Sequence, residues 1–477
     1  MKRLYVEDLF RFIENSPTAF HAVDTMKKEL ETQGYICLLE SENWKLEAGG
    51  KYYVIRNGSS LIAFRIPATD FKGFQIMASH SDSPCLKIKE NPVLKSENTY
   101  VKLNVEKYGG MLCATWFDRP LSVAGRLVVR ENDRIITKLV NVKRDLLMIP
   151  SLAIHMNREA NDGYRYNVQK DMLPLYGMDA KRRQKESMQT AAGQETERNM
   201  SEGILEIGED TAQVNFMEMI AGEAGVSERE ILGSELYLYN RMPGSVWGAK
   251  EEFISAGRLD DLECVYASLR AFLEADEGCA VPVHCVFDNE EVGSSTRQGA
   301  ASTFLADTLY RICEAFGMNG ADYRRRLSAS LMLSADNAHA VHPNFPDKGC
   351  PSNRPVMNRG IVVKFSGNQR YTSDAVSAAL FRRICGKAEV PVQVFTNRSD
   401  ILGGSTLGNI SGTQVAVSCA DIGLAQLAMH SSYETAGAKD LEYLIRAAKI
   451  FYESSVEEAG VGEYRLSTKD ENRRRQA

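Results

Sequence analysis

Histidine and carboxylate side chains of this chain gather in a few short segments that follow apolar, strand-like runs. The 477-residue sequence has seven histidines, and four of them (His80, His339, His342 and His430) lie in such segments. Imidazoles and carboxylates supply the ligands and the proton-transfer groups of metal-assisted hydrolysis. Taken singly, each histidine is more often a core or surface residue. Their joint placement beside carboxylates favours a metal centre.

The segment that is hardest to explain without chemistry follows the apolar run VPVHCVF. It carries three carboxylates within four residues, at Asp288, Glu290 and Glu291. Solvated charges usually lie on the polar face of a helix and not at the end of a buried strand. We therefore expect this segment to contribute to a site.

The other acidic segments are individually weaker. His80 and Asp82 are two residues apart, so they project to one face of an extended chain and Asp82 can fix the imidazole or share its metal. A surface pair is the ordinary alternative. Asp260 and Asp261 open a helix-like stretch, where helix capping accounts well for one of the two. Asp336 follows an apolar run and belongs to the same pattern.

The elements that must position these groups form two kinds of region. From Ala256 onward, helix-like and strand-like stretches alternate, which favours an α/β layer structure with a largely parallel sheet. Open sheets of this kind place their sites at strand ends. Earlier, residues 18–34 have apolar positions at helical spacing, with Thr18 as a possible N-cap.

Residues 95–245 have a different texture, with β-branched strand candidates at 126–130 and 134–142. We therefore expect one α/β domain, made of 1–94 and 246–477, with 95–245 inserted as a β-rich domain. Within the insertion, residues 178–204 are polar and charged with almost no large apolar side chain, which predicts a mobile surface loop.

Composition narrows the function classes. A formal net charge of -6, with 44% hydrophobic and 25% charged residues, is ordinary for a soluble globular protein and gives no basic face for nucleic acid. The start, MKRLYVEDLF, resembles neither a signal peptide nor a membrane span. Ten dispersed cysteines without a CxxC pair predict free, mostly buried thiols in a reducing cytoplasm. We expect no membrane and no nucleic-acid partner.

Several segments together resemble the aspartyl aminopeptidase family of two-zinc metalloaminopeptidases. The resemblance runs in unchanged order from about residue 15 to 450. The segments that carry it most specifically are HSDSP at 80–84, RLD at 258–260, NEEVGS at 289–294, DNAHAVHPN at 336–344 and MHS at 429–431. Weaker matches lie at 16–21, 115–119, 368–371 and 398–400.

The resemblance implies a zinc-peptidase α/β/α catalytic domain with an inserted all-β dimerisation domain. It also implies two Zn²⁺ per subunit, with Co²⁺ or Mn²⁺ as possible substitutes. In this reading Asp260 bridges the metals, His80 and Asp336 complete one site, and Glu291 and His430 complete the other.

Further roles are also implied by the resemblance. Glu290 is the expected general base, and Asp82 supports His80. The residues expected to contact a short peptide substrate are His155, His339, Lys364 and Tyr371. Lys364 is the natural partner of an acidic first side chain, although a solvated strand lysine is the plain alternative.

Members of this family form dimers through the inserted domain, and the dimers build twelve-subunit shells. A homo-oligomer is therefore expected here. His155, at the end of an apolar loop, would then reach the active site of a neighbouring subunit across a two-fold interface. The ordinary alternative is that His155 is a core residue.

Two positions depart from the family pattern, and both weaken the expected preference for acidic residues more than the expected hydrolysis. Asp261 stands where Asn is common, and Tyr433 stands where Arg is common. A broad-specificity aminopeptidase or an amidohydrolase is the alternative among enzymes. Outside enzymes, the alternative is a non-catalytic shell or scaffold that keeps the fold. The loss of a metal ligand or of Glu290 would favour the scaffold, and the sequence retains all of them.

Overall fold

The computed structural model describes residues 2–97, 99–178 and 215–468. Within it the chain divides into two compact units. Unit 1 consists of 1–84, 108–112 and 242–477, and unit 2 consists of 85–107 and 113–241. The expected insertion at 95–245 overlaps unit 2, whose first segment begins ten residues earlier than expected. Most of the loop predicted at 178–204 lies outside the described residues.

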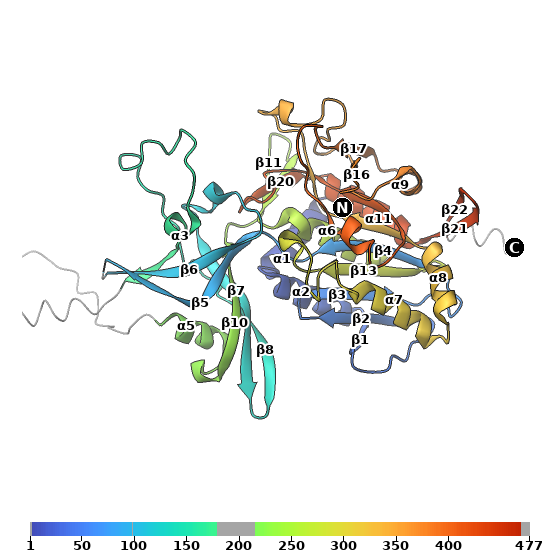
Figure 1. The fold of residues 1–477 in the computed structure, drawn as a ribbon, viewed down its shortest axis with the longest axis horizontal. Helices are drawn as coiled ribbons and strands as arrows, with labels where there is room; N and C mark the ends of the chain where they lie inside the picture. The colour runs from blue at the N-terminus through green and yellow to red at the C-terminus, as the bar shows by residue number, and fades with distance from the viewer. Residues whose placement is uncertain (1, 98, 179–214, 469–477) are drawn as a thin grey trace, which may run out of the picture. The chain divides into compact units, whose positions relative to one another are not determined.

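Unit 1 is built on a nine-stranded sheet (Figure 1). In spatial order its strands are β1 (Ile36–Cys37), β2 (Lys51–Arg56), β3 (Ser60–Arg65), β13 (Val281–Phe287), β4 (Phe74–His80), β14 (Leu331–Ala335), β18 (Ser418–Gly423), β16 (Ile361–Phe365) and β17 (Val392–Thr396). The central strands β13, β4, β14 and β18 pair in parallel. The prediction of a largely parallel sheet is therefore confirmed at the centre, while β2, β3 and β16 add antiparallel pairings.

Helices cover both faces of this sheet. One face packs against α1 (Lys2–Asn15), α2 (Ala19–Thr32), α6 (Leu259–Glu274), α9 (Ala375–Lys387) and α11 (Asp440–Tyr452). The other packs against α7 (Phe304–Ala315), α8 (Gly320–Ser328) and α10 (Leu407–Ser411). Strand β4 feeds both layers because its side chains alternate, with Met77 in the first core and Ile76 and Ala78 in the second. This is the expected α/β/α arrangement.

Unit 1 also contains smaller elements. A five-stranded sheet has the order β11 (Ser245–Trp247), β12 (Phe253–Ala256), β20 (Glu434–Gly437), β19 (Ala425–Leu427) and β15 (Ala338–His339). A hairpin of β21 (Ser454–Gly460) and β22 (Glu463–Thr468) follows α11. The 3-10 turns are η3 (Glu290–Val292) and η4 (Pro346–Lys348).

Unit 2 is built on a six-stranded antiparallel sheet. Its order is β8 (Arg134–Asn141), β7 (Leu121–Glu131), β10 (Ile231–Asn240), β5 (Cys85–Ser96), β6 (Tyr100–Tyr108) and β9 (Leu175–Met178). Two short helices, α3 (Val168–Asp171) and α5 (Phe216–Ala224), and the turns η1 (Cys113–Trp116) and η2 (Glu228–Glu230) accompany it. The β7–β8 hairpin contains both predicted strand segments, and Asn132 at its turn has a positive φ of 58°.

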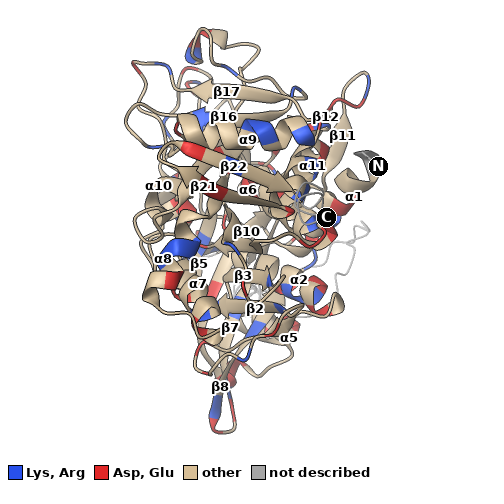
Figure 2. Ribbon diagram, turned by 90° about the vertical axis from the view of Figure 1, so that its right-hand side faces the viewer, with Lys and Arg blue, Asp and Glu red and all other residues tan. Residues whose placement is uncertain are grey.

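Some local expectations are corrected. Helix α2 begins after Thr18 as expected, but the Thr18 side chain does not cap it. Its hydroxyl instead lies 2.8 Å from His21 Nδ1. All ten cysteines are free, and five of them are buried. Acidic and basic segments are interspersed along the ribbon in Figure 2. No helix among the described residues is long and apolar enough to cross a membrane.

Candidate metal centre

Three neighbouring strands bring the predicted acidic and histidine segments to one edge of the large sheet. Strand β4 ends at His80, β13 ends just before Asp288, and β14 ends just before Asp336. Because β13, β4 and β14 pair in parallel, their carboxyl ends lie side by side. The turn η3, which carries Glu290 and Glu291, follows β13 directly.

Two further segments complete the site. Asp260 stands at the beginning of α6 in a non-helical conformation, two residues after Arg258, whose φ is 62°. Neither Asp260 nor Asp261 caps the helix, because the N-cap position belongs to Arg258 and no side-chain cap forms. The capping explanation offered for one of the two aspartates is therefore wrong. His430 lies in the loop between β19 and β20, also with a positive φ of 66°.

The Asp260 carboxylate lies between two imidazoles. Its Oδ1 is 3.5 Å from His80 Nε2, and its Oδ2 is 3.3 Å from His430 Nε2. The same His430 nitrogen is 3.4 Å from Glu291 Oε2. Both Asp260 and His80 are buried, while the His430 side chain is about a third exposed. The Asp260 carboxylate thus joins two parts of the cluster. The buried part, which contains His80, is called the deep half below, and the more exposed part, which contains His430, is called the open half.

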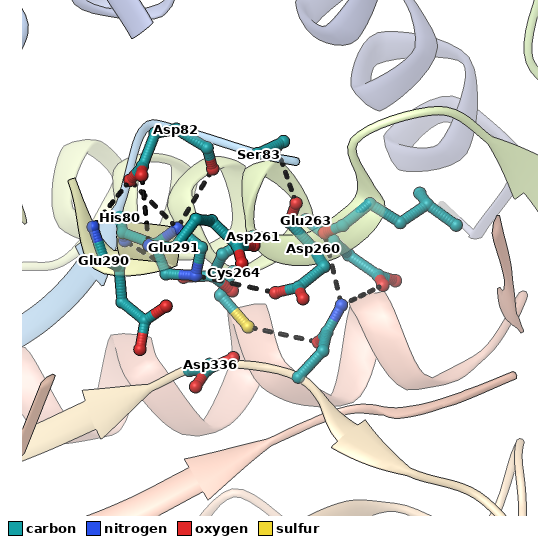
Figure 3. A network of polar contacts seen from close by, with 12 residues as sticks. His80, Asp82, Ser83, Asp260, Asp261, Glu263, Cys264, Glu290, Glu291 and Asp336 are labelled. Carbon is teal, nitrogen blue, oxygen red and sulfur yellow. Dashed lines mark hydrogen bonds and ion pairs between the residues drawn. The ribbon is translucent and has the colours of Figure 1, made fainter. Parts of the chain in front are cut away.

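The ligand atoms form overlapping groups of the size that a metal ion needs. His80, Asp260, Asp261 and Asp336 bring one ligand atom each within 4.8 Å of one another, and so do Asp260, Glu291 and His430. A third group consists of His80, Glu290 and Glu291. Figure 3 shows the members of the deep half and the η3 glutamates converging on one small region.

Unpartnered carboxylate oxygens show that this cluster is suited to bind cations. Asp260 Oδ1, Asp261 Oδ1 and Glu291 Oε1 are buried and have no hydrogen-bond partner among the described residues. A buried carboxylate oxygen without a partner carries a high desolvation cost. Nitrogen and carboxylate oxygen are also the donors that zinc accepts. The residues therefore fit a pair of metal ions that share Asp260.

The pKa values of the cluster are shifted by the same concentration of buried carboxylates. Burial, with repulsion among neighbouring carboxylates, raises the pKa of Asp261, Glu291 and Asp336 above their usual range. Burial opposes protonation of His80, but the neighbouring carboxylates of Asp260 and Asp82 and further negative charge nearby raise its pKa well above 6.5. These shifts all reflect the buried negative charge of the cluster, which bound cations would offset.

Asp82 fixes the η3 turn and the His80 ring (Figure 3). Its carboxylate accepts hydrogen bonds from the backbone N–H groups of Glu290 at 3.1 Å and Glu291 at 3.2 Å. Tyr108 donates its hydroxyl to the same carboxylate at 2.8 Å. The Asp82 backbone carbonyl lies 3.0 Å from His80 Nδ1, which orients the ring so that Nε2 faces Asp260.

Glu434 holds the backbone of the open half as Asp82 holds that of the η3 turn, and no sequence pattern predicts this role. This buried carboxylate accepts hydrogen bonds from the backbone N–H of Asp260 at 3.0 Å and of His430 at 2.8 Å. Burial raises its pKa to about 8. Asp82 and Glu434 thus hold the backbone of the ligand segments from two sides. Tyr108, which binds Asp82, was also missed.

The site opens into a cavity of about 170 Å³, called the metal cavity below. Its lining includes Asp260, Glu290, Asp336 and His430 and also three of the residues predicted to contact substrate, His339, Lys364 and Tyr371. His80, Asp82 and Glu291 join the site through the contacts given above. Burial raises the pKa of Glu290 to about 8, and burial lowers that of His339.

Lys364 is not the solvated strand lysine that was the plain alternative. Its side chain is 2% exposed, and its ammonium donates to the backbone carbonyls of Asp336 at 2.8 Å and Asn337 at 3.2 Å. It also lies 3.4 Å from the Asp336 carboxylate and 5.4 Å from the centre of the Tyr371 ring. Lys364 therefore holds Asp336 from behind while it lines the cavity.

The remaining predicted positions have these surroundings. His155 lies in unit 2 and is exposed, so within this chain it is not a core residue. Asp261 is buried, and its Oδ2 accepts a hydrogen bond from the His80 backbone N–H at 3.1 Å. The Tyr433 hydroxyl donates to the Pro243 carbonyl at 2.8 Å, and Tyr433 is not among the residues that line the metal cavity.

The chain is similar to known proteins over nearly its whole length. The family model "Aminopeptidase I zinc metalloprotease (M18)" matches residues 12–452. A probable M18 family aminopeptidase 2 from Clostridium novyi is 43% identical over 452 residues, which cover 94% of this chain and 98% of the relative.

Two solved structures are also similar. A chain of the Ape4 and Nbr1 complex superposes with a TM-score of 0.86 at 35% identity, covering 94% of this chain and 86% of that chain. The mApe1 dodecamer of S. cerevisiae gives a TM-score of 0.78 at 27% identity, covering 94% of this chain and 96% of that chain.

Proposed function

The chain belongs to the M18 family of zinc aminopeptidases, and we propose that it removes N-terminal acidic residues from short peptides at a centre of two zinc ions. The observation that carries this proposal is the Asp260 carboxylate between the imidazoles of His80 and His430. A carboxylate shared in this way is what a two-metal site requires, whereas a single site would leave one imidazole without a function.

The residues that would hold the metals fall into two sets. Asp260 belongs to both, His80 and Asp336 complete the deep set, and Glu291 and His430 complete the open set. Bound zinc ions would polarise the scissile carbonyl and lower the pKa of water. Asp82 and Glu434 keep the ligand segments in place through the backbone hydrogen bonds described above.

We propose Glu290 as the general base. It lines the metal cavity, and the Asp260-centred sets are complete without it. Its pKa of about 8, raised by burial, is close to the operating range in which a base is most effective. In this role its carboxylate takes a proton from the attacking water and delivers it to the leaving amine.

The proposed preference for an acidic first residue rests on Lys364. Among the residues that the structure describes, it is the only lysine or arginine in the lining of the metal cavity, and its charge attracts a carboxylate there. The Lys364 ammonium donates hydrogen bonds to the backbone carbonyls of Asp336 and Asn337. An acidic side chain of the substrate is therefore attracted by the ammonium charge, or it replaces one of these two carbonyls as the hydrogen-bond acceptor. Tyr371 and His339 form neighbouring parts of the wall.

A panel of aminoacyl anilides, assayed with and without a chelator, tests this function. Chelation should abolish hydrolysis, and zinc, cobalt or manganese should restore it. Aspartyl and glutamyl anilides should be cleaved faster than leucyl anilide. Full turnover in a demonstrably metal-free preparation would exclude the metal mechanism, and equal rates on all anilides would indicate a broad aminopeptidase.

We also propose that the protein assembles into a homo-oligomer in the cytoplasm. The dodecameric mApe1 supports the assembly, and ten free cysteines suit a reducing compartment. His155 is exposed beside Leu152, Ile154 and Met156, which are 55%, 48% and 74% exposed, so this loop is free to contact a neighbouring subunit. Mixing His155→Ala with Glu290→Gln subunits should restore activity if His155 acts in a neighbour, and verified subunit exchange without recovery would refute this role.

A further inference from the structure

A second cavity, called the neighbouring cavity below, adjoins the metal cavity in unit 1. Its volume is about 330 Å³, nearly twice that of the metal cavity. The two share His339, Phe395 and Gly404 in their linings, so they lie directly beside one another. The mechanism proposed above makes no use of this second space.

The charged groups in the two linings have opposite signs. The metal cavity is lined by three carboxylates and Lys364. In the part of the chain that the structure describes, the neighbouring cavity is lined by Lys348, Arg354 and Arg398 and by no carboxylate. Arg398 is already held by Asp400, with N–O distances of 2.7 and 3.0 Å.

Lys348 and Arg354 are held less tightly than Arg398, although the charge of Lys348 also acts on the Asp400 carboxylate. Among the described residues no ion pair involves either of them, and Arg354 donates only to the backbone carbonyl of Pro346, at 3.2 Å. Hydrogen bonds from Thr396 and Ser352 lower the pKa of Cys350, which also lines the cavity, to about 6. A Cys350 thiolate offsets one positive charge and leaves the lining cationic.

Apolar side chains complete the lining. Phe345 and Leu402 are 55% and 79% exposed, although both are large and apolar. A cavity with apolar walls and a few charged groups is the usual form of a peptide or small-molecule site. Because β15 is the last strand of its sheet, the segment at His339 between the two cavities also lies at a sheet edge.

We propose that the neighbouring cavity binds the part of the peptide that follows the scissile bond, and that Lys348 and Arg354 select a carboxylate there. This inference rests on the proposed function, since the metal cavity must hold the first residue and the scissile carbonyl. The carboxylate has two possible sources, namely an acidic side chain at the second position or the free C-terminus of a very short peptide.

Tripeptides with a common first residue, chosen as the one cleaved fastest, distinguish these sources. One pair compares a free C-terminal carboxylate with its amide, and a second pair of amides compares glutamate with glutamine at position two. We expect kcat/KM to be about two- to fivefold higher for the charged member of at least one pair, as for partly exposed charge pairs. The pair that shows the preference identifies the source.

Variants connect the preference to the cavity. In the double variant Lys348→Gln/Arg354→Gln the ratio within that pair should fall toward one, and a high salt concentration should lower it in the wild-type protein as well. Arg383→Gln is the matched control, since Arg383 is exposed on α9 and does not line either cavity. This control should keep both the ratio and the activity.

Two results would overturn the inference. One is equal kcat/KM within both pairs while the wild-type protein cleaves anilides normally. The other is a double variant that alters the preference for the first residue instead of the later carboxylate, since the cavity would then hold the first side chain. A protein that cleaves no peptide and no anilide refutes the proposed function itself, which is a different outcome.

Discussion

The metal cavity and the neighbouring cavity share lining residues, but they differ in how exposed their charged side chains are. Asp260 and Lys364 of the metal cavity are each 2% exposed and have fixed partners. Lys348 and Arg354 of the neighbouring cavity are exposed. Breaking a buried pair costs several kcal/mol, about 3–5, whereas exposed pairs contribute about 0–1 kcal/mol. The groups proposed to support the reaction are thus buried and have fixed partners. The groups proposed to select the rest of the peptide are exposed and can change partners.

The largest effect is expected at Glu290. In Glu290→Gln, kcat should fall by roughly 100- to 10,000-fold, as for a lost general base, while metal content stays near normal. The neighbouring substitution Glu291→Gln should lower both the rate and the metal content, because Glu291 contacts His430. Turnover near the wild-type value in Glu290→Gln would show that another group is the base.

A pH profile sharpens the same assignment. The base must be ionised, so kcat/KM should fall as the pH drops below the pKa of Glu290. Burial raises this pKa to about 8 without metal, and the positive charge of bound metal lowers it. The loss of activity at low pH should therefore have an apparent pKa below 8 in the metal-loaded enzyme. An unchanged pH profile in the residual activity of Glu290→Gln would contradict the assignment.

A smaller effect is expected at Glu434, which positions two ligand segments without lining the cavity. An amide in Glu434→Gln can accept only one of the two backbone hydrogen bonds well. Metal affinity should fall by about 10- to 100-fold, with activity recovering at saturating zinc. The exposed helical residue Glu314 provides the control substitution Glu314→Gln, which should change neither. Unaltered zinc affinity in Glu434→Gln would assign this carboxylate to folding alone.

A still smaller, selective effect is expected at Lys364. Lys364→Met removes support from Asp336 and so lowers activity on every substrate, but the preference for glutamyl over leucyl anilide should fall further. We expect about 1.5 kcal/mol, or roughly tenfold, in the ratio of kcat/KM values, the lower end for a charged hydrogen bond. Equal losses on both anilides would mean that Lys364 only holds Asp336.

The sequence predicts the groups that end strands and misses those that act through the backbone. His80, Glu290 and Asp336 follow apolar runs that could only be strands of one sheet, so their convergence follows from the parallel pairing. Glu434 and Tyr108 contribute through contacts with residues 174 and 26 positions away, respectively. No spacing along the chain encodes such contacts.

The alternative explanations that fail, a helix cap and a solvated lysine, have a related cause. Asp260 and Asp261 follow the sequence preference of a helix start, yet the site holds them in non-helical conformations. Lys364 lies in a strand whose first four residues are all buried, and the sequence does not show that its ammonium already has acceptors on Asp336 and Asn337. The cationic loops of the neighbouring cavity come from residues 348–354 and 398, which no sequence motif joins.

The number of zinc ions bound per subunit decides whether a pair of metals shares Asp260. Zinc should be titrated into the metal-free wild-type protein and into Asp260→Asn, with bound metal measured per subunit and activity followed in the same samples. We expect two zinc ions per wild-type subunit, activity that requires both ions, and weakened binding of both in Asp260→Asn. A single zinc ion in a fully active wild-type subunit would contradict this expectation.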